Sequence, residues 1–339
     1  MPWPTEAAHD RTGRSRLIPQ CRLPLCIPWS SQLTPSDRTS SLARRVRSGP
    51  VRYFVNAQES LGVRIGGPGA AFRVGCDEHG MGAMSMASSV FDGVRHIVID
   101  NPGSGSITVA AGTEPDLVEF WIEAVDERFL EQVQIRHDQD WLRISVPQQF
   151  FRNIKPQLRL TVPDGLAFVI KTGSADISIS ADIGRSKIVS GSGDITIGNA
   201  VDLDCKTGSG DISVARVEGS AARLNSGSGN ISVSEAHCPV IAKSGSGAVV
   251  VKSLRGDLQA NSGSGDIGIT ATKGSVDLRS ASGSLTIGVT DNLPAWLDLS
   301  SVSGDIRIAL ESTTRPAPGE PYISLRARTA SGDIAIHRA

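Results

Sequence analysis

The chain has 339 residues, with 34 basic and 35 acidic side chains, 36 glycines and an aromatic content of only 4%. A formal net charge of −1 excludes a strongly basic surface, so we expect no nucleic-acid partner. The glycine content and the scarcity of aromatic residues favour a β-rich protein with many turns.

Residues 1–90 form a low-complexity segment that contains eight prolines and no lysine and has no sustained hydrophobic period. Such a composition cannot bury a core, so we expect this segment to be disordered. An alternative is a start codon assigned too far upstream, because the methionines after Met1 are confined to Met81, Met84 and Met86.

No export or membrane signal is convincing in the sequence. The best apolar run, residues 23–29, is short and interrupted by proline, and the residues before Cys26 depart from a lipoprotein cleavage motif. No apolar run is long enough to span a membrane as a helix. We therefore expect a cytoplasmic location, with the cell surface or secretion as the alternative.

Residues 91–165 show irregular β patterns, which predict an N-terminal cap for the repeats that follow. Trp121 and Trp141 are expected to plug the core of this cap rather than to form sugar-binding platforms. The predicted strands cover 94–100, 106–110, 118–125, 133–137, 141–146 and 157–162, and the last is closed by a Pro163-Asp164-Gly165 turn.

Residues 166–339 repeat the motif Ser-Gly-Ser-Gly-Asp, at first every 17 to 19 residues and then at longer steps. Each repeat carries two stretches of alternating apolar residues, separated by the motif, which predicts two short half-buried strands. The position of the motif's Asp is occupied, in order, by Asp176, Asp194, Asp211, Asn230, Ala248, Asp266, Ser284, Asp305 and Asp333.

A period in this range predicts an all-β, single-stranded parallel β-solenoid, similar to a right-handed β-helix, with coils of about 18 residues. Stacked coils bring like residues together, so we expect a ladder of serine hydroxyls at the motif and glycine wherever the chain turns a corner. If the motif were instead a hairpin turn, the strands would form an antiparallel β-sandwich.

The repeated serines, cysteines and aspartates predict no catalytic, cofactor-binding or metal-binding residues. A nucleophilic serine needs an oriented base, and the six histidines do not recur with the repeat. Cys205 and Cys238 occupy different positions of their repeats, so neither a disulfide nor a metal pair is expected. We therefore predict no enzyme activity and no cofactor.

The Gly-Ser-Gly-Ser-Ile-Thr-Val segment at 103–109, the Val-Pro-Asp-Gly turn at 162–165 and the Ser-Gly-Ser-Gly-Asp-Ile-x-Ile repeats resemble the bacterial putative-adhesin family of β-strand-repeat domains of unknown function. The resemblance covers roughly residues 94–339 and implies a parallel β-solenoid. An adhesin label says little about function, because one fold serves many functions.

These features predict a non-catalytic interaction or adhesin-like protein whose flat faces bind an unknown protein or polymer. The last coil, which ends at residues 336–339, is expected to offer an open edge for homo-oligomers. Two alternatives are a calcium-binding β-roll-like protein, because of the recurring aspartates, and a carbohydrate-active β-helix enzyme, because aspartates in neighbouring coils would lie about 5 Å apart.

Overall fold

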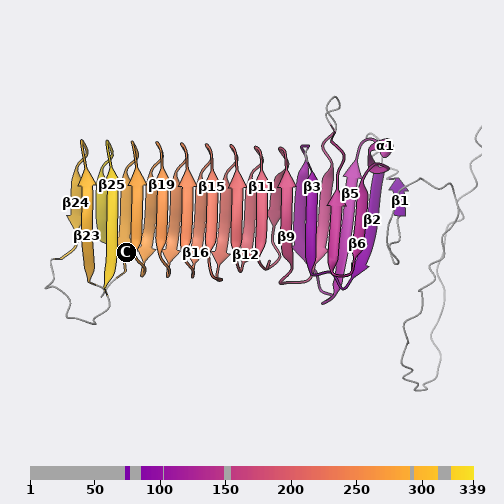
Figure 1. Ribbon diagram of the computed structural model, residues 1–339, viewed down its shortest axis with the longest axis horizontal. Helices are drawn as coiled ribbons and strands as arrows, with labels where there is room; N and C mark the ends of the chain where they lie inside the picture. Colours follow the sequence, from indigo (N-terminus) through magenta and orange to yellow (C-terminus); the bar gives the residue numbers. More distant parts are fainter. Residues whose placement is uncertain (1–72, 77–84, 102, 149–153, 291–293, 312–321) are drawn as a thin grey trace, which may run out of the picture. The chain divides into compact units, whose positions relative to one another are not determined.

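A computed structural model describes residues 73–76, 85–101, 103–148, 154–290, 294–311 and 322–339, which all belong to one compact unit, Pro50–Ala339. These residues form two β-sheets and one short helix, α1 (Glu127–Leu130), as Figure 1 shows. No helix in these ranges is long and apolar enough to cross a membrane.

The 14-stranded sheet, called sheet B, contains in spatial order β1 (Arg73–Cys76), β2 (Ser85–Asp92), β5 (Leu117–Ala124), β8 (Gln157–Val162), β4 (Ser106–Ala111), β10 (Asp176–Ile179), β12 (Ile195–Ala200), β14 (Ile212–Val217), β16 (Ile231–Ala236), β18 (Val249–Leu254), β20 (Ile267–Thr272), β22 (Leu285–Val289), β26 (Ile334–Arg338) and β24 (Ile306–Ala309). The 12-stranded sheet, called sheet A, contains β23 (Ala295–Ser301), β25 (Ile323–Thr329), β21 (Val276–Ser280), β19 (Leu258–Ser262), β17 (Val240–Ser244), β15 (Ala222–Ser226), β13 (Leu203–Thr207), β11 (Ser186–Ser190), β9 (Ala167–Thr172), β3 (His96–Asn101), β7 (Trp141–Ser145) and β6 (Gln134–Asp138).

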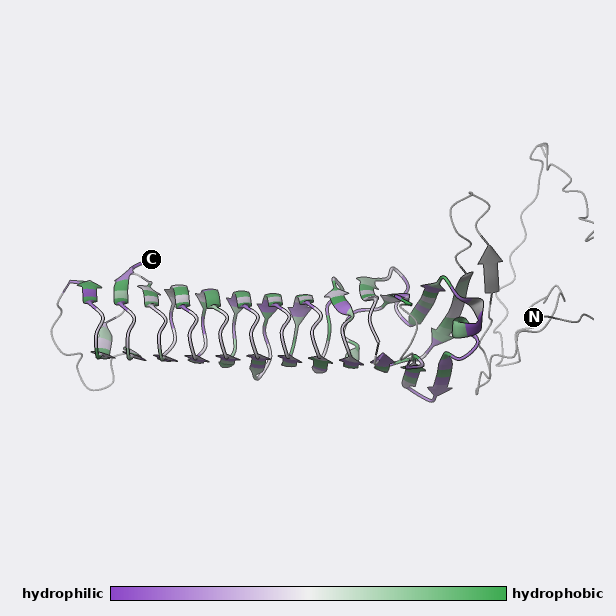
Figure 2. Cartoon of the chain, turned by 90° about the horizontal axis from the view of Figure 1, so that it is seen from above, coloured by the Kyte–Doolittle hydropathy of each residue, from purple (hydrophilic) through white to green (hydrophobic). Residues whose placement is uncertain are grey.

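From β9 onward the chain alternates between the two sheets, and each strand pairs in parallel with the strand of a neighbouring coil. Figure 2 shows the strands of the two sheets facing each other across the turns that join them. The predicted parallel β-solenoid is confirmed, and the antiparallel sandwich is wrong for the repeats. Antiparallel pairs in the described residues occur only in the cap: β1–β2, β2–β5, β5–β8 and β6–β7.

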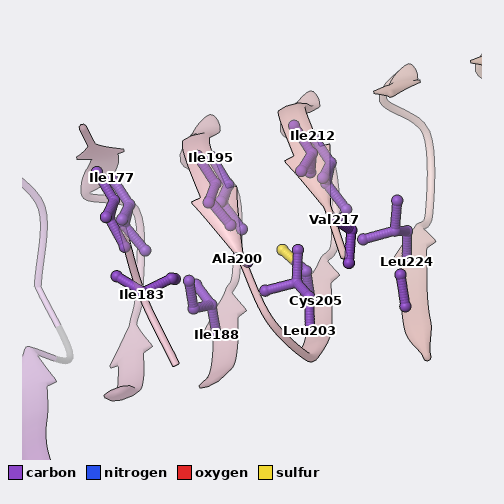
Figure 3. Close-up of a cluster of buried hydrophobic side chains, with 14 of the residues drawn as sticks. Ile177, Ile183, Ile188, Ile195, Ala200, Leu203, Cys205, Ile212, Val217 and Leu224 are labelled. Atoms are coloured by element: carbon purple, nitrogen blue, oxygen red, sulfur yellow. The ribbon is translucent and has the colours of Figure 1, made fainter. Parts of the chain in front are cut away.

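The core consists of like residues stacked coil on coil. Ile177, Ile195 and Ile212 are register partners in sheet B, and they face residues such as Ile188 and Cys205 from sheet A (Figure 3). All five side chains are 0% or 1% exposed. Each fully buried aliphatic side chain contributes roughly 1.5–3 kcal/mol, so every coil adds its own share of core.

Glycine occupies the corners because neighbouring coils approach so closely there. A Cβ atom at Gly210 would collide with the carbonyl oxygen of Gly193 one coil away, and one at Gly274 would collide with that of Gly256. The predicted need for glycine at both corners is therefore confirmed, although its cause is the adjacent backbone and not an unusual φ.

The six strands predicted in the cap correspond to β3 through β8, with ends shifted by at most two residues. Helix α1 was not anticipated. Regular structure also begins before residue 90, since β1 and β2 start at Arg73 and Ser85. The expectations for residues 1–72, Met81 and Met84 lie outside the described residues.

The order of the last two coils corrects one prediction. The coil of β25 and β26 lies between the coil of β21 and β22 and the coil of β23 and β24. The final residues therefore pair on both sides, and the open end is formed by β23 and β24. The chain skips one coil position and then returns to fill it, which explains the longer spacing of the last two repeats.

Candidate functional site

The first serine of each motif is buried at the corner and links two coils. The Ser244 hydroxyl accepts a hydrogen bond from the Gly247 N–H (2.9 Å) and donates one to the Gly229 carbonyl of the neighbouring coil (3.1 Å). The same two bonds recur at Thr207, Ser226, Ser262, Ser280, Ser301 and Thr329. The predicted hydroxyl ladder is formed by this first serine, whereas the second, such as Ser246, is exposed.

The motif's aspartates form a second ladder on the outside of the same corner. Asp194 Oδ1 accepts the N–H of Asp211 (2.9 Å), and Asp211 Oδ1 accepts the N–H of Asn230 (2.7 Å). Equivalent bonds are accepted by Asp176, Asn230, Asp266 and Asp333. Ala248 interrupts this ladder because its side chain has no acceptor. The recurring aspartates thus bind neighbouring coils together, and this structural role explains why they repeat.

The opposite corner carries a stronger carboxylate site at Asp202. This side chain accepts hydrogen bonds from the Ser220 N–H (2.6 Å), the Ser220 hydroxyl (2.8 Å) and the Ala221 N–H (3.1 Å). Arg185 donates a further bond to it (3.1 Å). The bonds from Ser220, followed by those from Ala221 and Arg185, lower the pKa of Asp202 from 3.8 to about 2.

Two shallow grooves lie over the outer face of sheet A. The first, of about 600 Å³, is lined by residues of β9, β11, β13 and β15, among them Lys187, Asp204 and Arg223. The second, of about 450 Å³, lies over β17, β19, β21 and β25. Both grooves therefore lie on the same side of the solenoid.

Basic side chains dominate this outer face. Eight of them point outward between β9 and β23, against three acidic ones, Asp204, Asp277 and Asp298. The eight are Lys171, Lys187, Lys206, Arg223, Lys243, Arg279, Arg326 and Arg328. The outer face of sheet B differs, because its first outward row is uncharged from β10 to β26 and has its first charge at Arg307 of β24. The uncharged residues are Ser178, Thr196, Ser213, Ser232, Val250, Gly268, Thr286 and Ala335.

Five of the basic residues form one line, called the basic row: Lys171, Lys206, Lys243, Arg279 and Arg328. Up to Arg279 the basic residues alternate with the uncharged residues Val189, Asn225 and Asn261. Arg279 and Arg328 then follow on neighbouring strands. Because strands lie about 4.8 Å apart, the first four charges recur about every 9.6 Å.

The tryptophans of the cap do not plug its core, which corrects that prediction. Trp141 lies on the outer face of sheet A, is 45% exposed and stacks on His96 with ring centroids 4.4 Å apart. Trp121 occupies an outward, half-buried position of β5. The large aromatic residues that fill the cap are Phe91, Phe120 and Phe129, all at most 3% exposed.

Cys205 and Cys238 are free and buried; the inward position of Cys205 was predicted, whereas Cys238 was expected only at a corner. Burial, and secondarily the charge of Asp204, raises the pKa of Cys205 to about 12. In the described ranges, no three His, Cys, Asp or Glu side chains are grouped so as to hold a metal ion.

The charged face was missed by the sequence reasoning, although a signal existed. Every member of the basic row lies five residues before the motif's Asp position, where Lys or Arg alternates with uncharged residues in the first repeats. The overall charge of −1 conceals this segregation, because the acidic residues are concentrated elsewhere, including the aspartate ladder.

Several solved structures resemble the chain at low sequence identity. A putative adhesin from Bacteroides fragilis is 15% identical, with a TM-score of 0.37, over 74% of this chain and 96% of its own. A putative adhesin from Parabacteroides merdae is 12% identical, with a TM-score of 0.39, over 75% and 95%. A putative lipid binding protein from Parabacteroides distasonis is 15% identical, with a TM-score of 0.37, over 74% and 96%. Likeness at this level says nothing about function.

No curated protein matches the chain. The family model described as Toastrack DUF4097 matches residues 130–337, which is more than half of the sequence and includes nearly all the repeats. This match agrees with the stacked two-strand coils and with the resemblance to strand-repeat domains of unknown function. The chain belongs to the Toastrack DUF4097 family.

Proposed function

We propose that this protein is a non-catalytic, adhesin-like interaction module that binds a protein or polymer through the outer face of sheet A. The observation that carries this proposal is the segregation of charge, with eight basic and three acidic side chains on that face between β9 and β23. A flat, charged and repetitive surface suits an extended partner, because each coil repeats the same kind of contact.

The use of the motif residues supports a non-catalytic role. The ladder hydroxyls bond backbone groups of two coils, as at Ser244, whereas a nucleophilic serine needs a neighbouring base. His237, the histidine within the central repeats, lies instead near Glu218 (3.7 Å) and Glu235 (3.9 Å). Release of reducing ends from a panel of polysaccharides would contradict this part of the proposal and favour the carbohydrate-active alternative.

The calcium-binding alternative depends on the aspartate ladder. One oxygen of ladder carboxylates such as Asp194 and Asp211 already accepts a backbone N–H, and the series of carboxylates is interrupted at Asn230, Ala248 and Ser284. Calcium prefers six to eight oxygen ligands. We expect the same melting temperature in millimolar calcium and in chelator, and a marked increase with calcium would favour the alternative.

We also propose that two copies associate through the coil of β23 and β24. Ile306 and Ile308 are 43% and 50% exposed there, whereas the equivalent Ile334 and Ile336 of the next coil are 0% and 1% exposed. A second copy offers an edge of the same width and apolar pattern. Light scattering after size exclusion should detect a dimer that Ile308→Lys abolishes, and a strict monomer at high concentration would contradict it.

The interaction role can be tested with cell envelopes of the producing organism. We expect the fluorescently labelled full chain to bind them, and Lys206→Gln with Lys243→Gln to weaken binding. Lys252→Gln with Lys273→Gln removes the same charge away from sheet A and should have little effect. Equal effects of the two double variants would contradict the proposal. Fractionation of native cells distinguishes a cytoplasmic from a surface location.

A further inference from the structure

We propose that the outer face of sheet A binds a linear polysaccharide that carries carboxylate groups, with the polymer lying across the strands. This inference rests on the proposed function and names the chemical class of its partner. It is carried by two independent features of the same face: the basic row and a row of residues that begins and ends with an exposed tryptophan.

The basic row provides charges at regular intervals for a polyanion. Lys171, Lys206, Lys243 and Arg279 recur about every 9.6 Å, which is two strand spacings. A sugar residue in an extended chain advances by roughly one strand spacing. A polymer with a carboxylate on alternate sugars could therefore meet a cation at every charged unit.

The available charge on this row is not cancelled by the acidic residues of the face. Asp204 lies 3.9 Å from both Lys187 and Lys206, and Asp277 pairs with Arg279 (3.0 Å). Asp298 of β23 pairs with Arg326 (3.0 Å) and with Arg328 (3.1 Å). Among the described residues, Lys171 and Lys243 have no ion-pair partner, and both are exposed. The net positive charge of the face thus persists after its internal ion pairs are counted.

The second feature is a row that joins Trp141 to Trp296. Strand register places Trp141 beside His96 at one end and Trp296 beside Ser324 at the other. Trp141 is 45% exposed and Trp296 is 60% exposed. An exposed indole offers an apolar ring against which the C–H face of a sugar can pack.

Both grooves lie along this tryptophan row. The first groove includes Ala167, Arg185 and Asp202, and the second includes Asp257 and Ser324. Ten strand steps separate β7 from β23 in sheet A, so the two indoles lie about 48 Å apart. That distance corresponds to roughly ten sugars at one sugar per strand, so a long polymer could engage the whole face.

The composition of this face argues against a membrane or a nucleic acid as the partner. The outward row beside the basic row contains few large apolar residues that a membrane surface would engage. Val98 and Val169 are neighbours at one end, and Ile241 lies singly between Arg223 and Gln259. Nucleic-acid phosphates are more closely spaced than the cations of the basic row. A polysaccharide offers carboxylates for the basic row and sugar rings for the indoles. The two rows run four residues, or about 13 Å, apart along the strands, so a chain that engages both crosses from one row to the other.

The test is affinity electrophoresis of the full chain in gels that contain hyaluronate, whose carboxylates lie on alternate sugars, or polygalacturonate. Methyl-esterified polygalacturonate is the neutral control. We expect retardation by the two acidic polymers only. Lys206→Gln with Lys243→Gln should weaken binding roughly tenfold, while Lys252→Gln with Lys273→Gln should leave it nearly unchanged.

The length of the polysaccharide gives a second readout, which does not depend on the charges of the basic row. Hyaluronate fragments of twelve sugars should bind more tightly than fragments of four, because only the longer ones can reach both indoles. Trp296→Ala should remove most of that length dependence. Trp296 is exposed on the end strand, so this substitution is not expected to unfold the protein.

Several outcomes would overturn the inference. These are no retardation by either acidic polymer, equal losses in the two double lysine variants, or equal binding to DNA or to phosphatidylglycerol vesicles. If no polysaccharide binds but Lys206→Gln with Lys243→Gln still weakens attachment to cell envelopes, the inference fails and the proposed function stands. If both assays fail, the proposed function fails as well.

Discussion

Replacement of Ser244 by alanine tests the hydroxyl ladder at the centre of the solenoid. The Ser244 side chain is 7% exposed, and its hydroxyl bridges the Gly247 N–H and the Gly229 carbonyl. Alanine fits the same space but leaves both backbone groups without this partner. The substitution therefore isolates the two hydrogen bonds from changes in packing.

The expected loss follows from the burial of these groups. A net hydrogen bond contributes about 1 kcal/mol, and a buried group left without a partner costs roughly 1–3 kcal/mol. Two such groups predict a destabilisation of about 2–4 kcal/mol for Ser244→Ala. Ser246→Ala, two residues away at an exposed position of the same motif, should change stability by less than about 0.5 kcal/mol.

The assay is equilibrium unfolding in urea, followed by far-ultraviolet circular dichroism, with wild type and both variants compared at the same temperature. Ser244→Thr provides a rescue control, because threonine occupies the equivalent position at Thr207 and Thr329. The reasoning is refuted if Ser244→Ala and Ser246→Ala shift the midpoint equally, or if Ser244→Thr is as damaging as alanine.

Three further predictions concern single positions. Ala248→Asn should restore the outer ladder by accepting the N–H of Asp266, which would raise stability by about 0.5–1.5 kcal/mol in urea unfolding, whereas a loss would contradict the ladder. The Asp202 carboxylate, whose pKa is lowered to about 2, stabilises the fold above about pH 4, and this contribution is lost as the pH falls through about 2. The difference in unfolding free energy between wild type and Asp202→Asn should therefore narrow over this range. A constant difference would contradict it. Alkylation of the native protein, mapped by mass spectrometry, should leave Cys205 unmodified until denaturant is added, since burial raises its thiol pKa to about 12. Rapid labelling without denaturant would show that the coil opens at Cys205.

The repeat made most of the fold predictable from sequence. The alternating residues around each motif placed strands such as β12 and β14 on a common core, and the recurrence of serine predicted stacking in parallel. These features depend on local periodicity and on contacts between equivalent positions, which one sequence displays directly.

The order of the end coils was not predictable in the same way. The longer steps before Asp305 and Asp333 showed that the pattern changes, but not that the coil of β25 and β26 is inserted before the coil of β23 and β24. Both arrangements stack the same residues and satisfy the same ladders. Spacing alone therefore does not choose between them.

The candidate binding face was hidden for a different reason. Trp141 and Trp296 are 155 residues apart in sequence, and only strand register places them in one row. The expectation that Trp141 is buried followed from its large apolar ring, whereas the alternation of its strand places Leu142 and Ile144 inside and Trp141 with Arg143 outside.

The central claim, that sheet A is the binding face while the motif residues hold the coils together, is tested most directly by lysine acetylation footprinting. The full chain is acetylated with and without saturating hyaluronate, and modified sites are quantified by mass spectrometry. The account predicts protection of Lys171, Lys206 and Lys243 on sheet A, with Lys252 on sheet B unchanged. Protection of Lys252 to the same extent, or no protection of the three sheet A lysines, would contradict it.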